Sequence, residues 1–261
     1  MTDSRTVIAL EKRLKPCRNV ITLGVHTNFS NYSEEAAAMI READTIYYPT
    51  LFYADIFDAM GKSLFPSYHT YKCVQDKIKQ TAIMALTGIP HPRTRIYYGR
   101  RKTEKIIHDF DFPFVAKVPR GSAMGRGVFL IQDTDALQAY AETVNPAYIQ
   151  EFIETDRDMR VVIIGSRVVH AYWRLGAPGE FRNNVAVGGE IVLDPLPAEA
   201  IDLALHTART CQWNDVGIDI IQQGSSYYVI EANMKYGREG FKQAGINYYE
   251  MMEGMIANGE I

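Results

Sequence analysis

Two apolar segments near the C-terminus carry acidic or amide residues at positions where a buried strand would be apolar. They span residues 217–221 and 229–233, and the turn-forming sequence Gln-Gly-Ser-Ser lies between them at residues 223–226. Apolar runs joined by such a turn predict a β-hairpin. The polar residues in these strands are therefore the first candidates for a functional site.

The predicted hairpin would gather oxygen-donor side chains. Because side chains alternate along a strand, Glu231 and Asn233 should share a face. With the turn centred on Ser225, Asp219 would lie opposite Glu231, with Cβ atoms about 5 Å apart. Two carboxylates that close repel each other unless a proton or cation lies between them. Carboxylates with an amide suit Mg²⁺ or Mn²⁺ rather than zinc. The alternative is a hairpin whose polar residues face solvent, and the hairpin alone does not decide between the two.

The rest of the pattern alternates between short strands and helices. In the first 70 residues it predicts strands at 20–25 and 44–49 and helices at 34–42 and 51–60, which indicates a small α/β unit. Beyond it the pattern predicts helices and strands in this order: helix 71–87, strand 95–98, helix 104–109, strands 114–118 and 128–131, helix 133–143, strand 148–153, a hairpin turning at 165–166, helix 197–211 and helix 247–257.

A lysine and a glycine-rich segment follow each other in the middle of the chain. Lys117 lies in the apolar segment 114–118, and a lysine is rarely buried without a partner. The next residues include Gly121, Gly125 and Gly127, whose backbone could approach a phosphate closely. The alternative is an exposed lysine on an edge strand, followed by an ordinary hairpin loop. The pattern matches neither the P-loop nor the Rossmann fingerprint.

Other candidates come from short polar patterns. Residues 150–153 could hydrogen-bond and pack against a planar base, or could simply form an interior strand. Asp158 and Arg160 are spaced to share a strand face, as are Arg182 and Asn184. Arginines beside a phosphate site can neutralise its charge. The alternative for each pair is a surface salt bridge.

Composition excludes several classes of protein. The net charge of -3 and a pI near 6.1 argue against a dedicated nucleic-acid binder. The three cysteines, Cys17, Cys73 and Cys211, are scattered and predict neither a disulfide framework nor a zinc site. No apolar run approaches membrane-spanning length, so no membrane partner is expected. Without an apolar signal core at the N-terminus, a cytoplasmic location is expected.

The order of these segments resembles that of the ATP-grasp superfamily, and most closely its RimK-like branch, the ribosomal-protein glutamate ligases and their relatives. The resemblance runs from about residue 75 to residue 256. The segments that carry it are Asp76-Lys77 before a helix that ends at 87–90, then 114–117, 121–127, 150–153, 158–160, 181–184, 217–220 and 229–233.

The resemblance implies a fold and a set of residue roles. The fold would be α/β (α+β): two ATP-grasp subdomains, 71–153 and 154–261, that grip ATP after a small α/β domain, 1–70. The nucleotide would be held by Lys77, Lys117, Gly121, Ser122, Gly125, Gly127, Gln150, Glu151, Phe152, Ile153 and Asp158, with the lysines at the phosphates, 150–153 at the adenine and Asp158 on the ribose side. Two Mg²⁺ or Mn²⁺ ions would be bound by Asp219, Glu231 and Asn233, with Glu231 bridging. Phosphoryl oxygens would be stabilised by Arg182, with Asn184 and Arg160 nearby.

The resemblance also implies an activity. It would be ATP-dependent joining of a carboxylate to an amine through an acyl phosphate, for example adding glutamate to a peptide, a protein tail or a small molecule. Relatives follow the Glu-x-Asn motif with Ser-Pro-Gly, whereas this chain has the basic segment 234–240, so the substrates stay open. The alternatives are a kinase of the same fold, an ATP-binding module without catalysis, and a purely structural domain. Oligomeric state is open, with a homo-oligomer as one option.

Overall fold

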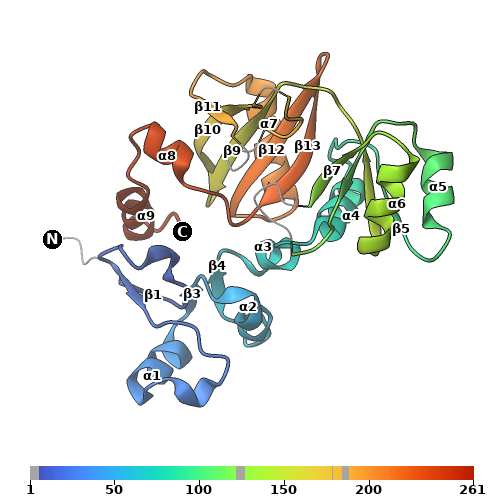
Figure 1. Ribbon diagram of the computed structural model, residues 1–261. Helices are drawn as coiled ribbons and strands as arrows, with labels where there is room; N and C mark the ends of the chain where they lie inside the picture. Colours follow the sequence, from blue (N-terminus) through green and yellow to red (C-terminus); the bar gives the residue numbers. More distant parts are fainter. Residues whose placement is uncertain (1–5, 122–126, 178, 184–187) are drawn as a thin grey trace.

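The computed structural model describes residues 6–121, 127–177, 179–183 and 188–261. Its strands form three sheets that follow one another along the chain (Figure 1). The strands are β1 (Val7–Ala9), β2 (Val20–Thr22), β3 (Thr45–Tyr47), β4 (Ser63–Phe65), β5 (Thr94–Tyr97), β6 (Phe114–Lys117), β7 (Val128–Ile131), β8 (Ala147–Glu151), β9 (Arg157–Ile164), β10 (Arg167–Leu175), β11 (Glu190–Val192), β12 (Asp215–Gln223) and β13 (Ser226–Asn233). The helices are η1 (Lys12–Leu14), η2 (Phe29–Asn31), α1 (Glu34–Glu42), α2 (Thr50–Ala59), α3 (Tyr68–Cys73), α4 (Lys77–Thr87), α5 (Lys102–Asp109), α6 (Thr134–Thr143), α7 (Ala198–Thr210), α8 (Glu239–Gln243) and α9 (Tyr248–Ala257).

The N-terminal sheet has the strand order β2-β1-β3-β4, and its neighbouring strands are parallel. Helix α1 begins where it was predicted, because Ser33 caps it by accepting a hydrogen bond of 3.2 Å from the backbone N–H of Ala36. The sequence pattern predicts β2 and β3 but not β1 and β4. We call this part, residues 6–65, the N-terminal unit.

The middle sheet has the order β5-β8-β6-β7, and its pairs are antiparallel. Helices α5 and α6 pack on it through a small apolar core that includes Ile106, Leu137 and Tyr140. Strand β6 lies between β8 and β7, so both of its edges are paired. The residues of β6 are therefore interior, which matters for Lys117.

The C-terminal sheet has the order β11-β10-β9-β12-β13 and is antiparallel throughout. Alternate residues of β9 and β12, such as Val161 and Ile218, face helix α7 and form the main core with it. The intervening residues, including Asp158 and Asp219, lie on the opposite face. The fold is that predicted, α+β with several separate sheets, while the domain boundaries at 70 and 153 stay predictions.

One predicted helix, 71–87, is wrong. The structure has two helices there, α3 and α4, and the chain between them turns at Gln75, whose φ is 54°. Asp76 then caps α4 by accepting a hydrogen bond of 3.1 Å from the backbone N–H of Lys79. The apolar stripe continues across this break, so periodicity alone does not reveal it.

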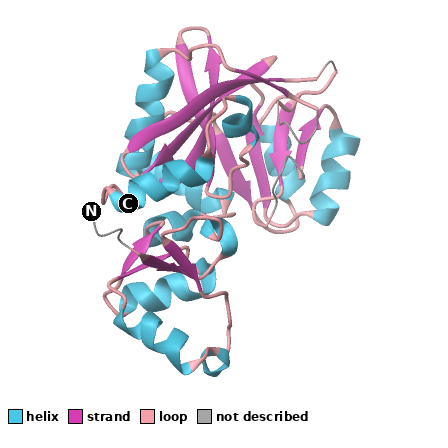
Figure 2. Ribbon diagram, turned by 90° about the vertical axis from the view of Figure 1, so that its left-hand side faces the viewer, coloured by secondary structure: helices cyan, strands magenta, loops and turns pink. Residues whose placement is uncertain are grey.

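The N-terminal unit and the C-terminal residues share a core. Tyr47 and Phe65 of the N-terminal unit pack in one apolar cluster with Met252 and Ile256 of α9. Figures 1 and 2 show α9 and the C-terminus beside the N-terminal sheet. Within the described residues, no helix is long and apolar enough to span a membrane.

Candidate functional site

The C-terminal hairpin places Asp219 opposite Glu231, as predicted. Its turn is centred half a residue earlier than predicted, because Gln223 pairs with Ser226. A β-bulge just beyond Asp219 shifts the register by one residue and restores the predicted pairing. The two carboxylates therefore meet across neighbouring strands.

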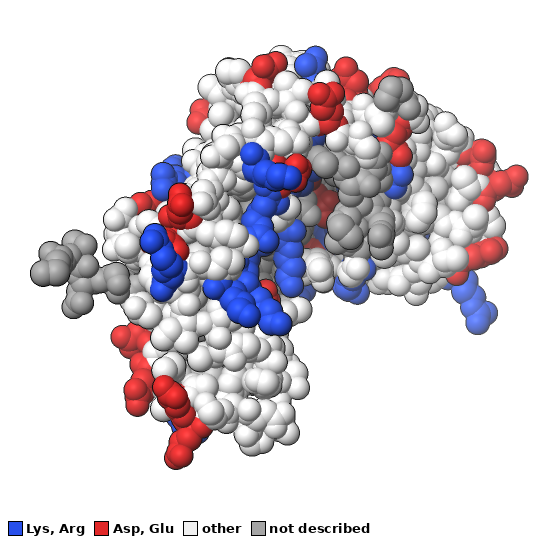
Figure 3. All heavy atoms as spheres, turned by 60° about the vertical axis from the view of Figure 1, so that its left-hand side comes forward, with Lys and Arg blue, Asp and Glu red and all other residues white. Residues whose placement is uncertain are grey.

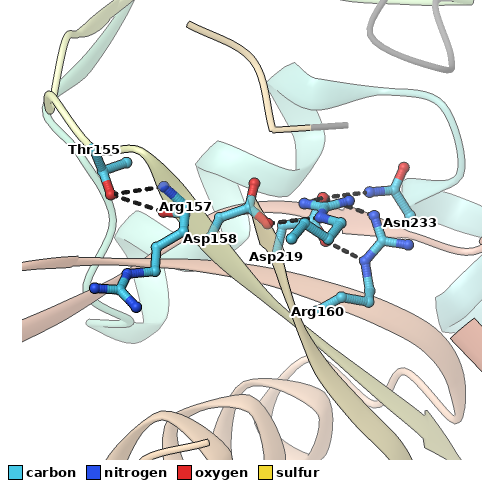
Figure 4. Close-up of polar contacts among 7 residues, drawn as sticks. Thr155, Arg157, Asp158, Arg160, Asp219 and Asn233 are labelled. Atoms are coloured by element: carbon cyan, nitrogen blue, oxygen red, sulfur yellow. Dashed lines mark hydrogen bonds and ion pairs between the residues drawn. The ribbon is translucent and has the colours of Figure 1, made fainter. Parts of the chain in front are cut away.

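Asp219 is the centre of a buried network of charged side chains (Figure 4). Arg160 donates to it twice, from Nε to Oδ1 and from Nη2 to Oδ2, the latter at 2.9 Å. Nη2 of Arg174 lies 3.0 Å from the same Oδ2, and its Nε donates to Oδ1 of Asp158 at 2.6 Å. Nδ2 of Asn233 donates to Oδ2 of Asp219 at 3.1 Å. The four charged groups are buried, so they are not the surface salt bridges of the alternative interpretation.

The charges in this network shift the pKa values of its two carboxylates in opposite directions. Burial alone would raise the pKa of Asp219, but the positive charges of Arg160 and Arg174 outweigh it, so its pKa lies below the ordinary value. Burial raises the pKa of Asp158 above the ordinary value, although Arg174 opposes this. Asp219 therefore favours the ionised form more strongly than Asp158 does.

Glu231 is paired with a lysine from another part of the chain. Nζ of Lys77, at the start of α4, lies 3.0 Å from Oε1 of Glu231. The backbone N–H of Lys77 donates to the carbonyl of Pro119 at 2.9 Å, which ties the start of α4 to the entry of the glycine-rich segment. Lys77 is itself buried. The predicted phosphate lysine thus lies against the predicted metal ligand.

Lys117 is buried at the end of the interior strand β6, with 6% of the residue exposed. This excludes the alternative of an exposed lysine on an edge strand. Burial lowers the pKa of Lys117 to about 8; the charge of nearby Lys77 lowers it too, whereas that of Glu231 raises it. An anionic group that binds beside Lys117 would stabilise the charged form of this lysine.

The two described ends of the glycine-rich segment are held by backbone bonds. The N–H of Gly121 donates to the carbonyl of Gln75 at 3.2 Å, and the N–H of Val118 donates to the carbonyl of Gly127 at 2.7 Å. Both glycines have positive φ, 68° and 75°. The predicted phosphate contacts Ser122 and Gly125 lie outside the described residues.

Residues 150–153 lead from β8 towards β9. The backbone N–H of Glu151 donates to the carbonyl of Arg93 at 2.9 Å, and Nε2 of Gln150 donates to Oγ1 of Thr94 at 2.9 Å. The alternative of an interior strand is therefore right as far as Glu151. Phe152 and Ile153 continue beyond the strand, and the binding of a base there stays a prediction.

Arg182 has an acidic neighbour that the sequence reading missed. It donates to both oxygens of Glu180, at 2.8 Å from Nε and 2.7 Å from Nη2. These hydrogen bonds lower the pKa of Glu180 to about 2. Asn184, predicted to act beside Arg182, lies outside the described residues.

One pocket between the middle and C-terminal sheets gathers most of the predicted residues. Its walls include apolar side chains of four strands, Val115, Val128, Ile221 and Ile230. The predicted site residues that line it are Lys117, Gln150, Glu151, Phe152, Ile153, Asp158, Arg182, Asp219 and Glu231. A pocket lined by both apolar and charged side chains suits a ligand that has a flat apolar part and an anionic part.

Arg174 also lines this pocket and was missed by the sequence reading. It lies on β10 directly opposite Asp158 of β9. A signal exists in the sequence, since Arg174 is a charged residue directly after the apolar run 171–173. A straight hairpin turning at 165–166 would instead pair Asp158 with Trp173, and a bulge in β10 moves Arg174 into place.

The fit of a divalent metal can be judged from the donor set. Among the described residues, no group of three or more His, Cys, Asp or Glu side chains could hold a metal ion. The candidate set is two facing carboxylates, Asp219 and Glu231, with Asn233 bonded to the first. Mg²⁺ needs few protein ligands because water and phosphate fill its shell, so this set fits it. Arg160 and Lys77 now neutralise these carboxylates and would have to share them with an ion.

Comparison with known sequences gives a family. Residues 74–256 match the model of the RimK-like ATP-grasp domain. A protein of Legionella pneumophila (strain Corby) named probable alpha-L-glutamate ligase is 33% identical over 177 residues, which cover 65% of this chain and 58% of that protein. A protein of the same name from Vibrio vulnificus (strain YJ016) is 29% identical over 195 residues, covering 72% and 64% respectively. The chain thus matches less than two thirds of the length of these relatives.

Solved structures show the same fold. A RimK domain ATP-grasp protein from Sphaerobacter thermophilus superposes with a TM-score of 0.71 at 19% identity, covering 97% of this chain and 98% of that one. D-alanine–D-alanine ligase from Bacillus anthracis gives a TM-score of 0.70 at 15% identity, covering 98% and 97%. The architecture is therefore the ATP-grasp fold.

Proposed function

The chain belongs to the RimK-like ATP-grasp family, and from this we propose that it is an ATP-dependent ligase that joins a carboxylate to an amine with release of ADP and phosphate. The observation that carries the proposal is the meeting of Asp219 and Glu231 across β12 and β13, beside the buried lysines Lys77 and Lys117. Buried lysines next to paired carboxylates suit a metal-bound triphosphate better than they suit a structural core.

In this proposal the pocket between the two sheets holds ATP. Its apolar walls and residues 150–153 take the adenine, and Asp158 lies on the ribose side. Lys77 and Lys117 contact the phosphates, and the glycine-rich segment with Gly121, Ser122, Gly125 and Gly127 covers them.

The proposed reaction has two steps. A carboxylate oxygen of the substrate attacks the γ-phosphorus of ATP, the bond to the β-phosphate oxygen breaks, and ADP leaves. An amine nitrogen then attacks the carbonyl carbon of the acyl phosphate, the carbon–oxygen bond breaks, phosphate leaves and a proton is lost. The chain's part is positioning and charge neutralisation, by Lys117, Arg182 and, in our proposal, Arg174, with Asn184 beside Arg182.

Two Mg²⁺ ions are proposed to bind at Asp219, Glu231 and Asn233, where they would neutralise phosphate charge. Arg160 and Arg174 keep Asp219 ionised, so it can serve as a ligand across the neutral pH range. Mn²⁺ would fit the same oxygen donors.

The names of the relatives and the surface charge of this chain bear on the second substrate. The two relatives are named probable alpha-L-glutamate ligases, which makes glutamate the first amino acid to test. The segment after Asn233 exposes the basic residues Lys235, Arg238 and Lys242. Figure 3 shows Lys and Arg side chains gathered in a band on one face of the molecule. We propose that an amino acid, peptide or protein tail is the second substrate, and that the enzyme acts in the cytoplasm.

An ADP-release screen tests the proposal. The protein is incubated with ATP and Mg²⁺ and with amino acids, dipeptides and small carboxylic acids singly and in pairs, and products are identified by mass. We expect ADP release only with a carboxylate, and an amide product when the amine is added. Nucleotide binding without substrate-dependent ADP release across the screen would favour a binding module instead.

Hydroxylamine separates ligase from kinase. It captures an acyl phosphate as a hydroxamate, so a ligase should form the hydroxamate of its acid substrate in the absence of the natural amine. A phosphorylated alcohol, with no hydroxamate, would show that the site transfers phosphate to a hydroxyl.

A further inference from the structure

A second buried cluster lies outside the candidate site, where the N-terminal unit meets the start of β12. Asp215 is fully buried at the start of β12, four residues before Asp219. Its Oδ1 accepts a hydrogen bond of 2.5 Å from the hydroxyl of Tyr236, and its Oδ2 accepts one of 2.8 Å from the hydroxyl of Tyr48. Tyr48 belongs to the N-terminal unit, and Tyr236 lies three residues after Asn233. One carboxylate thus joins segments far apart in the chain.

Arg13 of η1 supplies the positive charge of this cluster. Its Nε lies 4.0 Å from Oδ2 of Asp215 and donates to the hydroxyl of Tyr248 at 3.2 Å. Its guanidinium lies 4.7 Å from the ring centre of Tyr236, and 5.6 Å from those of Tyr48 and Tyr248. The cation is therefore held by aromatic rings as well as by the carboxylate.

The cluster is surrounded by apolar side chains of both parts of the molecule. Tyr48 and Phe65 of the N-terminal unit share a core with Val162 and Ile164 of β9 and with Phe241 of α8. A carboxylate as deeply buried as that of Asp215 is costly unless it keeps its cation and its hydrogen bonds. This requirement fixes the position of the N-terminal unit relative to β12.

A chain of contacts leads from this cluster to the candidate site. Residues 215, 217 and 219 lie on one face of β12, because side chains alternate along a strand. A Cβ at Gly217 would lie 3.0 Å from Cβ of Tyr236 and 3.0 Å from Cδ of Arg160. Tyr236 and Arg160 therefore both pack against this glycine, and Arg160 is one of the residues that donate hydrogen bonds to Asp219.

We propose that Arg13 and Tyr48 are positioning residues for the candidate site. Through Asp215 they hold Tyr236, and Tyr236 fixes the segment after Asn233 against Gly217 and Arg160. The N-terminal unit thereby sets the geometry of the proposed metal ligands without touching the nucleotide. This inference rests on the proposed function, because the site that is supported is the proposed metal site. The supporting residues Arg13 and Tyr48 lie in the N-terminal unit, outside the middle and C-terminal sheets.

The test uses tyrosine-to-phenylalanine substitutions, which remove one hydroxyl and leave the ring. Tyr48→Phe and Tyr236→Phe each remove one hydrogen bond to Asp215. Tyr32→Phe is the matched control, since the Tyr32 hydroxyl bonds to other residues of the N-terminal unit, among them the carbonyl of Gly24 at 2.9 Å and the N–H of His26 at 3.2 Å. Tyr48 is the decisive position because it lies in the N-terminal unit; it also keeps the test open should Tyr236→Phe fail to fold.

The first measurement is the affinity for ADP with and without Mg²⁺, by titration calorimetry. Tyr48→Phe and Tyr236→Phe should bind ADP with Mg²⁺ about fivefold more weakly, a loss of roughly 1 kcal/mol, and should bind ADP without Mg²⁺ as the wild type does. Tyr32→Phe should match the wild type in both. Equal affinities in all proteins, or equal losses with and without Mg²⁺, would overturn the inference.

The second measurement separates this inference from the proposed function. Hydrogen exchange of residues 234–240 should be faster in Tyr48→Phe than in Tyr32→Phe, whatever the protein binds. If wild-type protein shows no effect of Mg²⁺ on ADP affinity, the proposed function fails, and the exchange result alone decides whether Tyr48 holds the segment. Unchanged exchange in Tyr48→Phe would contradict the positioning role.

Discussion

Lys117 is buried at the end of β6, and burial lowers its pKa to about 8. In the free protein it therefore loses its charge as pH rises through 8, whereas a bound phosphate chain favours the charged form. We predict that ADP affinity falls as pH rises from 7 to 9, by roughly fivefold to tenfold, because a one-unit shift beyond the pKa leaves about a tenth of the lysine protonated. Calorimetry of ADP binding at both pH values, in buffers of different ionisation enthalpy, should show that Lys117 takes up a proton when ADP binds at pH 9.

Lys117→Arg is the control for this prediction. An arginine stays protonated throughout this range. The ADP affinity of this variant should therefore not depend on pH between 7 and 9, even if it is lower than that of the wild type. If wild-type protein and Lys117→Arg show the same pH profile, another group is responsible.

Glu231 faces Asp219 and is partly accessible, with 24% of its side chain exposed. Glu231→Gln keeps its shape and can still accept a hydrogen bond from Lys77, so we predict a folded protein. It removes the charge that would hold a metal ion, and ADP release should fall at least 100-fold, roughly the loss of one strong electrostatic contact in a transition state. Glu199→Gln, an exposed change on α7, should have wild-type activity. Substantial turnover by Glu231→Gln would remove the basis for this metal assignment.

At the scale of elements, two β-bulges decide which residues meet. The bulge beside Asp219 cancels an error in the predicted turn, so the pairing with Glu231 was predicted correctly. The bulge in β10 brings Arg174 opposite Asp158, and this partner was missed. Neither bulge has a glycine that marks it in the sequence. Facing residues in hairpins are therefore predictable from strand alternation only as far as the ladder stays regular.

Gly217 gives an element-scale prediction. A Cβ there would come within 3.0 Å of Tyr236 and Arg160, so Gly217→Ala must displace one of them. We predict a loss of about 1–3 kcal/mol in the free energy of unfolding, typical of overpacking in a core. Urea denaturation measures it. Gly237→Ala is the control, because a Cβ there meets nothing within 4 Å. Equal stability of the two variants would mean that Gly217 has more room than the contacts indicate.

At the scale of the whole molecule, the order of elements was largely predictable and their junctions were not. The strand and helix order follows from periodicity and caps such as Ser33. The break at Gln75 and the core shared by the N-terminal sheet and α9 depend on contacts between distant residues. No local pattern connects Arg13 and Tyr48 with Asp215, because each pairing requires the complete fold.

The same junction gives a stability prediction. Burial raises the pKa of Asp215, and Arg13 opposes this shift. Arg13→Met leaves a buried carboxylate without its cation, so we predict a loss of about 3 kcal/mol in the free energy of unfolding at pH 7.5. Because the pKa of Asp215 is raised in the folded state, its carboxylate takes up a proton as the pH falls. A protonated carboxyl no longer requires the cation, so the loss in the free energy of unfolding caused by Arg13→Met should shrink towards pH 5.

The double variant Arg13→Met with Asp215→Asn checks the cause of this loss. Removing both charges should restore much of the stability at pH 7.5, since neither partner is then left unpaired. If the double variant is less stable than the sum of the two single changes, the pair is not coupled as the geometry implies.

The most direct test of the central claim is a crystal structure with ADP and Mn²⁺, in which anomalous scattering locates the metal. Our account predicts manganese bound to Asp219 and Glu231, with the amide oxygen of Asn233 turned towards it, and with Arg160 and Lys77 shifted from their present contacts. The oxygens of these side chains should coordinate the metal directly. A structure with nucleotide bound, but with Asp219 still held by Arg160, Glu231 still held by Lys77 and no manganese between them, would contradict it.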